Sequence, residues 1–321
     1  MATQTVVREA EVQVNVVDVV KEADGVVSLH LAAQDGESLP PWTPGAHIDL
    51  VMGDGLIRQY SLCGSATESK TYRIGILLSP ESRGGSQFVH DNLHEGASLT
   101  VRGPRNHFSF AASAKYLFIA GGIGITPMLP MIAEAEEAGR DWELFYGGRS
   151  RDSMAFLDEL AAYGDRVTVV PQDEAGHLDL PEILREPRPN TLVYGCGPEG
   201  MLNALEEQCG HWPSGSLHLE RFTAKEQDAD ATDTAFELVL ERSGQTLQVG
   251  ADQSVFEVVR EAGVSVLGSC LEGICGTCET EVISGDLDHR DSVLDPEERE
   301  SGEVMMICVS RCRSARLTLD L

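Results

Sequence analysis

The sequence predicts a multidomain α+β chain with a β-rich first segment, an α/β second segment and a small C-terminal segment that carries a cysteine-rich loop. Three observations lead to this fold class: the chain has 321 residues, its hydrophobic periodicity changes twice, and four cysteines gather near its end. A chain of this length exceeds one typical core and suggests two or three domains. Its hydrophobic fraction of 42% is ordinary for a globular protein, and no apolar run is long enough for a membrane span.

The charge of the chain limits its partners. The formal net charge is −28, from 52 acidic and 24 basic residues. Nucleic acid is a poor partner, because phosphate contacts need clustered Lys and Arg. The acidity serves solubility or steers the chain toward a basic patch on another protein, and charge alone does not choose between these. The first residues, MATQTVVREAEVQ, are polar and charged, unlike a secretory signal. We therefore expect a cytoplasmic protein with reduced thiols and no membrane contact. The sequence leaves the oligomeric state open, and a monomer is the default.

The periodicity divides the chain into segments. Short alternating runs such as EVQVNVVDVV and YRIGILL, broken by Gly and Pro, predict a β-rich first domain. Strand–helix alternation then predicts parallel strands with crossover helices. A polar stretch reads as a linker, and a hairpin, a helix and the cysteine loop follow it. The boundaries are 1–112 for the β-rich domain, 113–222 for the α/β domain, 223–234 for the linker and 235–321 for the C-terminal domain.

Two motifs of the β-rich domain together predict a phosphate site. RQYS places Arg58, Tyr60 and Ser61 on one strand, and RGGSQF places Gly85 and Ser86 at the start of a short helix. Arg58 can make a bidentate contact with a phosphate, Tyr60 can pack on a planar ring, and Ser61 can donate a hydrogen bond. A helix start offers unpaired N–H groups to an anion. Each feature alone is more often structural, but an arginine and a helix start together can neutralise one phosphate of a bound flavin.

The α/β domain opens with a buried strand that runs into a glycine turn, KYLFIAGGIGITPM. Gly122 and Gly124 allow a sharp turn and a close approach to a ligand, and a helix is expected from about Thr126. Thr126 is a candidate N-cap, and Pro127 lies where a first-turn proline is tolerated. The glycines do not match G-x-G-x-x-G, so this turn alone is a weak signal for a dinucleotide site.

A second strand end repeats the pattern in TLVYGCGPEGM. Cys196, Gly197 and Pro198 form the turn, and a helix is expected from about Glu199. Two strands that both end in glycine turns make a crevice at the carboxyl edge of a parallel sheet, which is where dinucleotides bind. A cysteine at this edge is usually an inert core residue. Beside a nicotinamide and a flavin it would be a small polarizable group next to the hydride path.

Four cysteines near the C-terminus have the spacing of a plant-type [2Fe–2S] ligand set. Cys270, Cys275 and Cys278 follow C-x4-C-x2-C, and Cys308 comes 29 residues later. Glycines between the first three let the backbone wrap around a two-iron core. Backbone N–H groups of such a loop can donate to the cluster sulfurs.

Other interpretations of the cysteines fit less well. A zinc site normally has two C-x2-C pairs or a Cys/His mixture, and here only one tight pair exists. Cys312 is the nearest rival to Cys308, which we favour because Arg311 and Arg313 place Cys312 in a polar stretch that is expected to be exposed. The cysteines at 63 and 209 are expected to be ordinary thiols.

The order of these motifs resembles one family of electron-transfer proteins. RQYS, RGGS, GGIGITPM, CGPEGM and CLEGICGTC, followed by a distant cysteine, are similar to phthalate dioxygenase reductase and its relatives. These are reductase components of two-component Rieske oxygenases, including the vanillate demethylase and carnitine monooxygenase types. The resemblance covers essentially the whole chain. It implies a Greek-key flavin-binding β-barrel of the FAD-binding FR type, a Rossmann-like NAD(P)-binding domain and a β-grasp [2Fe–2S] ferredoxin domain.

The resemblance also implies roles for single residues. The RQYS and RGGS residues match the flavin site, and the two glycine turns match the nucleotide site. Phe222 aligns with an aromatic that covers the flavin in relatives, although a core phenylalanine would look the same. DHRDSVL, from Asp288, matches the family and is expected to fold near the cluster. FMN is favoured as the flavin. NADH is favoured as the donor, but Arg149 and Arg151 leave NADPH open.

The resemblance implies that electrons pass from NADH through FMN and a [2Fe–2S] cluster to a separate Rieske-type oxygenase, which docks transiently. No general base or catalytic triad is expected, because cofactors carry the chemistry. Two alternatives stay open: a reductase for another acceptor such as a heme monooxygenase, and a redox-sensing regulator without turnover. The substrate of the oxygenase cannot be inferred.

Overall fold

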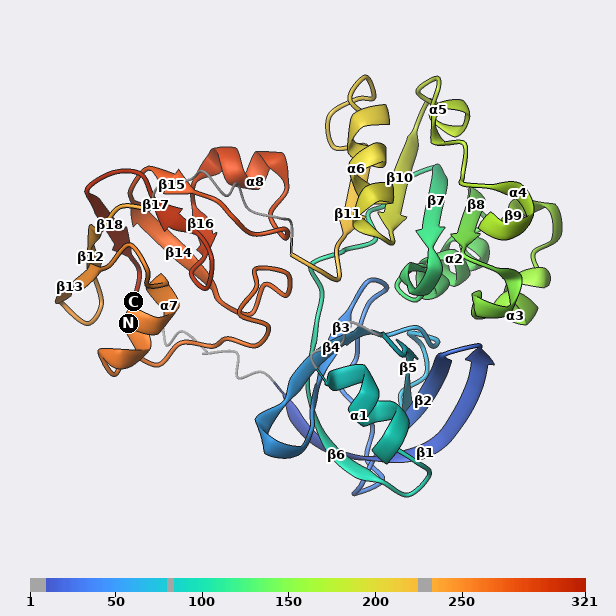
Figure 1. Ribbon diagram of the computed structural model, residues 1–321, viewed down its shortest axis with the longest axis horizontal. Coiled ribbons are helices and arrows are strands. Elements are labelled where there is room, and N and C mark those ends of the chain that lie inside the picture. Colours follow the sequence, from blue (N-terminus) through green and yellow to red (C-terminus); the bar gives the residue numbers. More distant parts are fainter. Residues whose placement is uncertain (1–9, 80–83, 225–232) are drawn as a thin grey trace. The chain divides into compact units, whose positions relative to one another are not determined.

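The computed structural model describes residues 10–79, 84–224 and 233–321, and these form two compact units, Met1–Glu220 and Arg221–Leu321 (Figure 1). Most of the expected linker, residues 225–232, and Arg83 of the RGGS motif lie outside the described residues. Among the described residues no helix is long and apolar enough to cross a membrane. The fold class predicted from the sequence is confirmed, and each unit is described by itself below.

The first unit begins with a closed antiparallel sheet of six strands in the order β4-β3-β6-β1-β2-β5. A bridge between Leu62 and Ile74 joins its two edges, which closes the barrel. Strand β6 returns to pair with both β1 and β3, the long-range return of a Greek key. The elements are β1 Glu11–Ala23, β2 Val26–Ala33, β3 His47–Val51, the 3-10 turn Gly53–Gly55, β4 Ile57–Ser61, β5 Thr71–Leu77, α1 Gly85–Asn92 and β6 Ser98–Arg105.

The barrel core follows the two-residue period of its strands. In β5, Tyr72, Ile74 and Ile76 are buried and alternate with Arg73 and Gly75. The same alternation in the other strands fills the interior with aliphatic side chains.

The second half of the first unit is a parallel sheet of five strands in the order β11-β10-β7-β8-β9. Leu117 to Ala120 of β7 are all fully buried, because side chains on the two faces of this central strand enter two different cores. The strands are β7 Lys115–Gly121, β8 Asp141–Gly148, β9 Val167–Pro171, β10 Thr191–Cys196 and β11 Leu217–Glu220. The helices are α2 Met128–Glu137, α3 Leu157–Ala161, α4 Gln172–Ala175, α5 Leu180–Ile183 and α6 Glu199–Gln208, with 3-10 turns at Gly122–Ile125, Arg151–Ser153 and Gly164–Arg166.

The second unit is a mixed sheet in the order β13-β12-β18-β14-β16, with a separate two-stranded ribbon β15-β17. Helix α7 is capped by a reciprocal pair, Ser254 and Glu257, and packs its apolar side on the sheet. The elements are β12 Phe236–Leu240, β13 Gln245–Val249, α7 Val255–Glu261, β14 Glu279–Ser284, β15 Leu287–Asp288, α8 Pro296–Ser301, β16 Val304–Met306, β17 Arg311–Cys312 and β18 Arg316–Leu319.

Candidate functional site

The barrel brings Arg58 of β4 against the first residue of helix α1. A Cβ at Gly85 would lie 2.4 Å from Cγ of Arg58, so only glycine leaves room for the arginine to cross the helix start. Gly84, with φ of +86°, is the N-cap, and no side chain caps this end. The helix start and the guanidinium stem therefore meet at one place, which fits an anionic group such as a flavin phosphate.

Tyr60 and Ser61 continue the same strand. Tyr60 lies two residues from Arg58, on the same side of β4. Burial raises the pKa of Tyr60 to about 12, against the opposing effect of the Arg58 cation, so the phenol keeps its proton at neutral pH. Ser86, by contrast, uses its hydroxyl to accept a hydrogen bond from the N–H of Ser79 at 3.1 Å, which holds the start of α1 against the end of β5.

The two glycine turns of the parallel sheet touch each other. Strands β7 and β10 are neighbours, so both turns lie at the same carboxyl edge. A Cβ at Gly124 would lie 2.3 Å from the carbonyl oxygen of Cys196, and one at Gly197 would lie 2.9 Å from Cα of Gly121. Gly122 has φ of +55°, the left-handed region that favours glycine. The two turns that are expected to line a crevice therefore meet, and their close approach requires glycine at positions 124 and 197.

The start of helix α2 differs from the prediction. The helix begins at Met128, after a 3-10 turn, and its N-cap is Pro127 rather than Thr126. The Thr126 hydroxyl donates to the carbonyl oxygen of Ile123 at 2.9 Å, so it closes the turn and does not cap the helix. The prediction of Thr126 as N-cap was wrong because the glycine turn continues as 3-10 structure through Ile125. Helix α6 begins at Glu199, where the sequence places it.

A carboxylate that sequence reasoning missed lies between the barrel and the crevice. Glu220, the last residue of β11, accepts a hydrogen bond from Ser61 Oγ at 3.4 Å, and Cys196 Sγ lies 4.0 Å from the same carboxylate oxygen. Burial raises the pKa of Glu220 to about 8, against the opposing effect of the Ser61 hydrogen bond. Burial raises the pKa of Cys196, so this residue stays a thiol. The sequence signal that could have revealed Glu220 is its place in HLERF, where an acidic residue ends a strand of the parallel sheet.

The ends of β8 and β9 carry mixed charges beside this crevice. In register, Gly121 of β7 pairs with Gly147 of β8, and Gly148 pairs with Pro171 of β9. Arg151 makes a two-pronged ion pair with Glu174, with N–O distances of 3.1 and 3.3 Å. Arg149 is exposed.

In the second unit the four cysteines of the predicted cluster site lie in two hydrogen-bonded pairs. The Cys270 and Cys275 thiols share a hydrogen bond, which raises the pKa of Cys270 and lowers that of Cys275. Cys308 is hydrogen-bonded to Cys278, which raises its pKa. Among the described residues no three His, Cys, Asp or Glu side chains converge as a single metal ion requires. Two thiols at each of two points fit a two-iron core, where each iron takes two thiolates.

The loop that carries Cys270, Cys275 and Cys278 is held in an unusual conformation. Leu271, Gly273 and Gly276 all have positive φ, at 57°, 70° and 71°. The N–H of Glu272 donates to Cys270 Sγ at 3.3 Å, and the Thr277 hydroxyl lies 3.2 Å from Cys275 Sγ. The loop therefore turns donors toward the sulfurs, which stabilises thiolates.

The DHRDSVL segment lies behind this loop. A Cβ at Gly273 would lie 3.0 Å from Cα of Asp291, and the N–H of Ser292 donates to the Gly273 carbonyl at 2.8 Å. The buried Asp291 carboxylate accepts hydrogen bonds from the N–H groups of Val293 and Leu294. The segment thus packs against the cysteine loop.

The surroundings of Cys312 differ from those expected. Arg311 and Cys312 are both buried, so the expectation of an exposed stretch was wrong. Arg311 donates to the carbonyl oxygens of Thr234 and Gly250 and lies over the Phe236 ring, and these contacts account for its burial. Cys312 Sγ instead meets the hydroxyl of Ser314 at 3.0 Å. Phe222, at the start of the second unit, is 39% exposed.

Comparisons with known proteins identify two of the domains and the family of the chain. Residues 118–207 match the oxidoreductase NAD-binding domain, and residues 238–313 match the 2Fe-2S iron-sulfur cluster binding domain. The chain is 45% identical over 301 residues to phenoxybenzoate dioxygenase subunit beta of Ectopseudomonas oleovorans, covering 93% of this chain and 94% of the relative. It is 38% identical over 307 residues to phthalate dioxygenase reductase of Burkholderia cepacia, covering 94% of each.

A solved structure matches nearly the whole chain. It is an intact type IV self-sufficient cytochrome P450 monooxygenase, with a TM-score of 0.92 and 44% identity. The match covers 97% of this chain and 41% of the other, so the chain spans about two fifths of that protein's length.

Proposed function

Because the chain belongs to the phthalate dioxygenase reductase family, we propose that it takes a hydride from NADH and delivers single electrons to a separate oxygenase component. It is an oxidoreductase with an NAD-binding domain and a [2Fe–2S] domain. The observation that carries the proposal is the meeting of Ser61, Cys196 and Glu220, since it joins the barrel strand expected to bind flavin to the crevice expected to bind nucleotide.

The chain's residues would bind and orient the cofactors. Arg58 and the start of α1 would hold the flavin phosphate, and this match to one terminal phosphate supports FMN. The two glycine turns would let a dinucleotide approach, with its nicotinamide beside Cys196. A bound flavin supplies the change in electron number, because it accepts a hydride and releases electrons singly. Cys270, Cys275, Cys278 and Cys308 would hold the two irons.

Glu220 would hold a proton where Ser61 of the barrel meets Cys196 of the glycine turn. With a pKa of about 8, its carboxyl keeps the proton at neutral pH, and Ser61 Oγ lies within hydrogen-bond distance of it. A neutral acid beside the nicotinamide path avoids placing a bare negative charge against an electron-rich ring.

NADH is the proposed donor. Glu174 neutralises Arg151. Asp152 and Asp173 add two further acids against the remaining cation, Arg149, so a 2′-phosphate would meet more negative than positive side chains at this edge. The exposed Arg149 cation can still contact a 2′-phosphate, so we expect NADPH to be used as a secondary donor.

The proposed acceptor is a Rieske-type oxygenase that docks transiently. Relatives are named as subunits or reductases of dioxygenase systems, which supports an oxygenase partner. A reductase that turns over repeatedly must release its acceptor, which favours a small contact. None of the eight cysteines forms a disulfide in the part of the chain that the structure describes, which supports a cytoplasmic location.

The test is product formation with purified components. The chain, NADH and a candidate Rieske oxygenase should give product, and omission of the chain should abolish it. Extraction should release FMN, with two irons and two acid-labile sulfides per chain. Release of FAD would correct the flavin assignment, and zinc at the C-terminal thiols would overturn the proposal.

A heme monooxygenase is the second candidate acceptor, because a solved structure that matches 97% of this chain with a TM-score of 0.92 is a cytochrome P450 monooxygenase. Parallel assays with a Rieske oxygenase and a cytochrome P450 separate the two. Faster NADH-driven reduction of the heme protein would favour the second candidate.

A further inference from the structure

A phenylalanine with a strained backbone lies in the segment that follows β8. Phe156, the N-cap of α3, has φ of +63° and ψ of +19°, in the left-handed region that a bulky residue rarely adopts. The residue is nevertheless only 3% exposed. Backbone strain of this kind persists only where the surrounding contacts hold it, and such positions gather at functional sites. The contacts that hold Phe156 therefore indicate what it does.

The Phe156 ring lies against a glycine of the barrel. A Cβ at Gly75 of β5 would lie 3.1 Å from Cζ of Phe156 and 2.8 Å from Cγ2 of Thr126. Thr126 closes the first glycine turn, where the nucleotide is expected to bind. The start of α3 and the nucleotide turn therefore share one contact position on the barrel. A change in the size of either side chain at this position alters how closely the turn can approach the barrel.

An arginine of the same barrel strand holds the ring in place. The Arg73 guanidinium lies over the Phe156 ring, 5.2 Å from its centroid, and makes an ion pair with Glu159 of α3 at 2.9 Å. The same guanidinium donates to the carbonyl oxygen of Cys63 at 2.6 Å. Because Cys63 follows Ser61 by two residues, Arg73 joins the end of the proposed flavin strand to the segment that carries Phe156.

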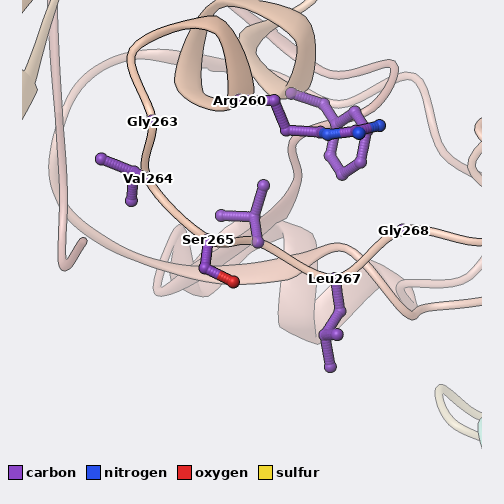
Figure 2. Close-up of a pocket in the computed structure, with 8 residues that line it drawn as sticks. Arg260, Gly263, Val264, Ser265, Leu267 and Gly268 are labelled. Atoms are coloured by element: carbon purple, nitrogen blue, oxygen red, sulfur yellow. The ribbon is translucent and has the colours of Figure 1, made fainter.

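A second arginine–phenylalanine contact, in the other unit, lacks this support. Arg260 lies over the Phe256 ring at 5.5 Å, beside a cavity of about 410 Å³ (Figure 2). Arg260 is exposed, and exposure weakens a cation–π contact. The Arg73 side chain is only 19% exposed, and a carboxylate and a carbonyl oxygen hold it as well as the ring. The contact between Arg73 and Phe156 is thus part of the packed interior rather than a surface arrangement.

The segment that carries Phe156 touches the barrel at one further point. The carbonyl oxygen of Asp152 accepts a hydrogen bond from the N–H of Asp24 at 2.8 Å. Arg149, which is expected to approach the nucleotide, precedes this contact by three residues. The nucleotide is therefore expected to meet two elements, the first glycine turn and this segment, that both rest on the barrel.

We propose that Phe156 is a positioning residue for hydride transfer, whose ring sets the distance between the nucleotide turn and the barrel and so the approach of the nicotinamide to the flavin. The inference rests on the proposed function. Phe156 acts through Gly75 and Thr126 and takes no part in making or breaking bonds. Misplacement of reacting atoms by about 1 Å can cost about 100-fold in rate, so a fixed spacing at this contact is worth a strained backbone.

The experiment measures flavin reduction in the full-length holoprotein by anaerobic stopped flow over a series of NADH concentrations. Phe156→Leu shortens the side chain and keeps it apolar, whereas Gly75→Ala adds a methyl group that presses on the ring. Each variant should lower the limiting rate at least about tenfold and leave the Kd for NADH within about twofold, because geometry in the reacting complex affects rate more than affinity. The long-wavelength absorbance of a nicotinamide stacked on a flavin should weaken in both.

The double variant Gly75→Ala/Phe156→Leu gives a readout that a merely structural role would not. The smaller side chain leaves room for the added methyl group, so its limiting rate should exceed that of either single variant at least about threefold. Phe145→Leu is the matched control. Phe145 of β8 belongs to the core on the opposite face of the parallel sheet, so its variant should reduce flavin at the wild-type rate.

A milder variant covers the case in which Phe156→Leu does not fold. Glu159→Gln releases Arg73 from its ion pair, and because Glu159 is 43% exposed, this variant should fold. Its limiting rate should fall about threefold. Glu143→Gln, which removes an exposed pair with Arg188, is the control. Flavin affinity of the apoprotein, measured by fluorescence titration, should be the same in all of these variants.

An unchanged limiting rate in Phe156→Leu or in Glu159→Gln would overturn the inference. An equal loss in Phe145→Leu would also overturn it, because a loosened core would then explain both. A weaker Kd for NADH at an unchanged limiting rate would assign Phe156 to binding instead, and no recovery in the double variant would rule out the shared contact at Gly75. Failure of NADH to reduce the wild-type flavin would reject the proposed function and the inference with it, whereas normal reduction in the wild type and in every variant would reject the inference alone.

Discussion

The two glycine turns of the first unit and the cysteine loop of the second unit are proposed to handle the same electrons, but they are built in opposite ways. Three of the four proposed cluster ligands lie within nine residues, and the loop's own backbone turns a donor toward them. In the crevice, Gly124 faces Cys196, and Ser61 faces Glu220, each pair far apart in the sequence. A local site can be recognised from spacing, whereas a site built from distant segments depends on the whole fold.

Loss of one cluster ligand should have the largest effect on electron transfer. It also tests whether the cysteine loop can lose its function without harm to the first unit. Cys275→Ser should remove iron and acid-labile sulfide and abolish cytochrome c reduction, because an oxygen ligand replaces a thiolate. Ferricyanide reduction by NADH should persist, since the first unit is untouched. Cys312→Ser is the control and should keep the cluster. A full cluster in Cys275→Ser, measured by iron content, would refute the ligand assignment.

Gly124→Ala should disrupt the contact between the two glycine turns and leave the cysteine loop of the second unit intact. The added Cβ would meet the Cys196 carbonyl at 2.3 Å, and backbone cannot move aside as a side chain can. A displacement of this size should slow flavin reduction by NADH about 100-fold. Gly200→Ala, in open space on α6, is the control. Stopped-flow absorbance measures the rate, and equal rates in the two variants would show that the turns do not bind nucleotide.

Arg58→Gln should weaken flavin binding. Loss of a charge-assisted phosphate contact predicts an affinity about 10- to 100-fold lower. Arg102→Gln, which removes an exposed barrel arginine paired with Glu11, should leave affinity unchanged. Flavin fluorescence titration of the apoprotein measures both. Equal affinity of Arg58→Gln and wild type would place the phosphate elsewhere.

Glu174→Gln should alter nucleotide preference. Release of Arg151 from its ion pair leaves it available for a 2′-phosphate, so the ratio of kcat/KM for NADPH to that for NADH should rise about tenfold. Glu143→Gln removes a similar pair, with Arg188, at the opposite end of strand β8 and should not change the ratio. An unchanged ratio in Glu174→Gln would show that the 2′-phosphate does not bind at the carboxyl ends of β8 and β9.

The smallest effect should be the pH dependence that Glu220 imposes. Its pKa of about 8 in the folded chain lies above that of an unfolded glutamate, so the folded state holds an extra proton between about pH 5 and 8. The free energy of unfolding of the first unit should therefore fall as pH rises through this window, and Glu220→Gln should flatten the slope. Thermal unfolding followed by flavin fluorescence measures it, with exposed Glu207→Gln as control. An unaltered slope would mean that Glu220 is ionised at neutral pH.

The errors of sequence reasoning share one cause. Thr126 was predicted as an N-cap from local pattern, but the turn before it continues as 3-10 structure where it packs against the neighbouring strand end. Arg311 was expected to be exposed because arginine usually is, yet carbonyl oxygens from distant segments bury it. Both outcomes depend on contacts between segments that no local pattern encodes.

The amino-acid sequence by itself determined the fold class and the order of the domains, and it predicted four cluster cysteines, because periodicity and ligand spacing are local properties of the chain. Only the tertiary structure decided that Glu220 joins Ser61 and Cys196, that Arg58 crosses Gly85, and that Phe156 lies strained against Gly75. The physical reason is that burial, backbone strain and pKa arise from how distant segments pack together, and that packing exists only after the chain has folded.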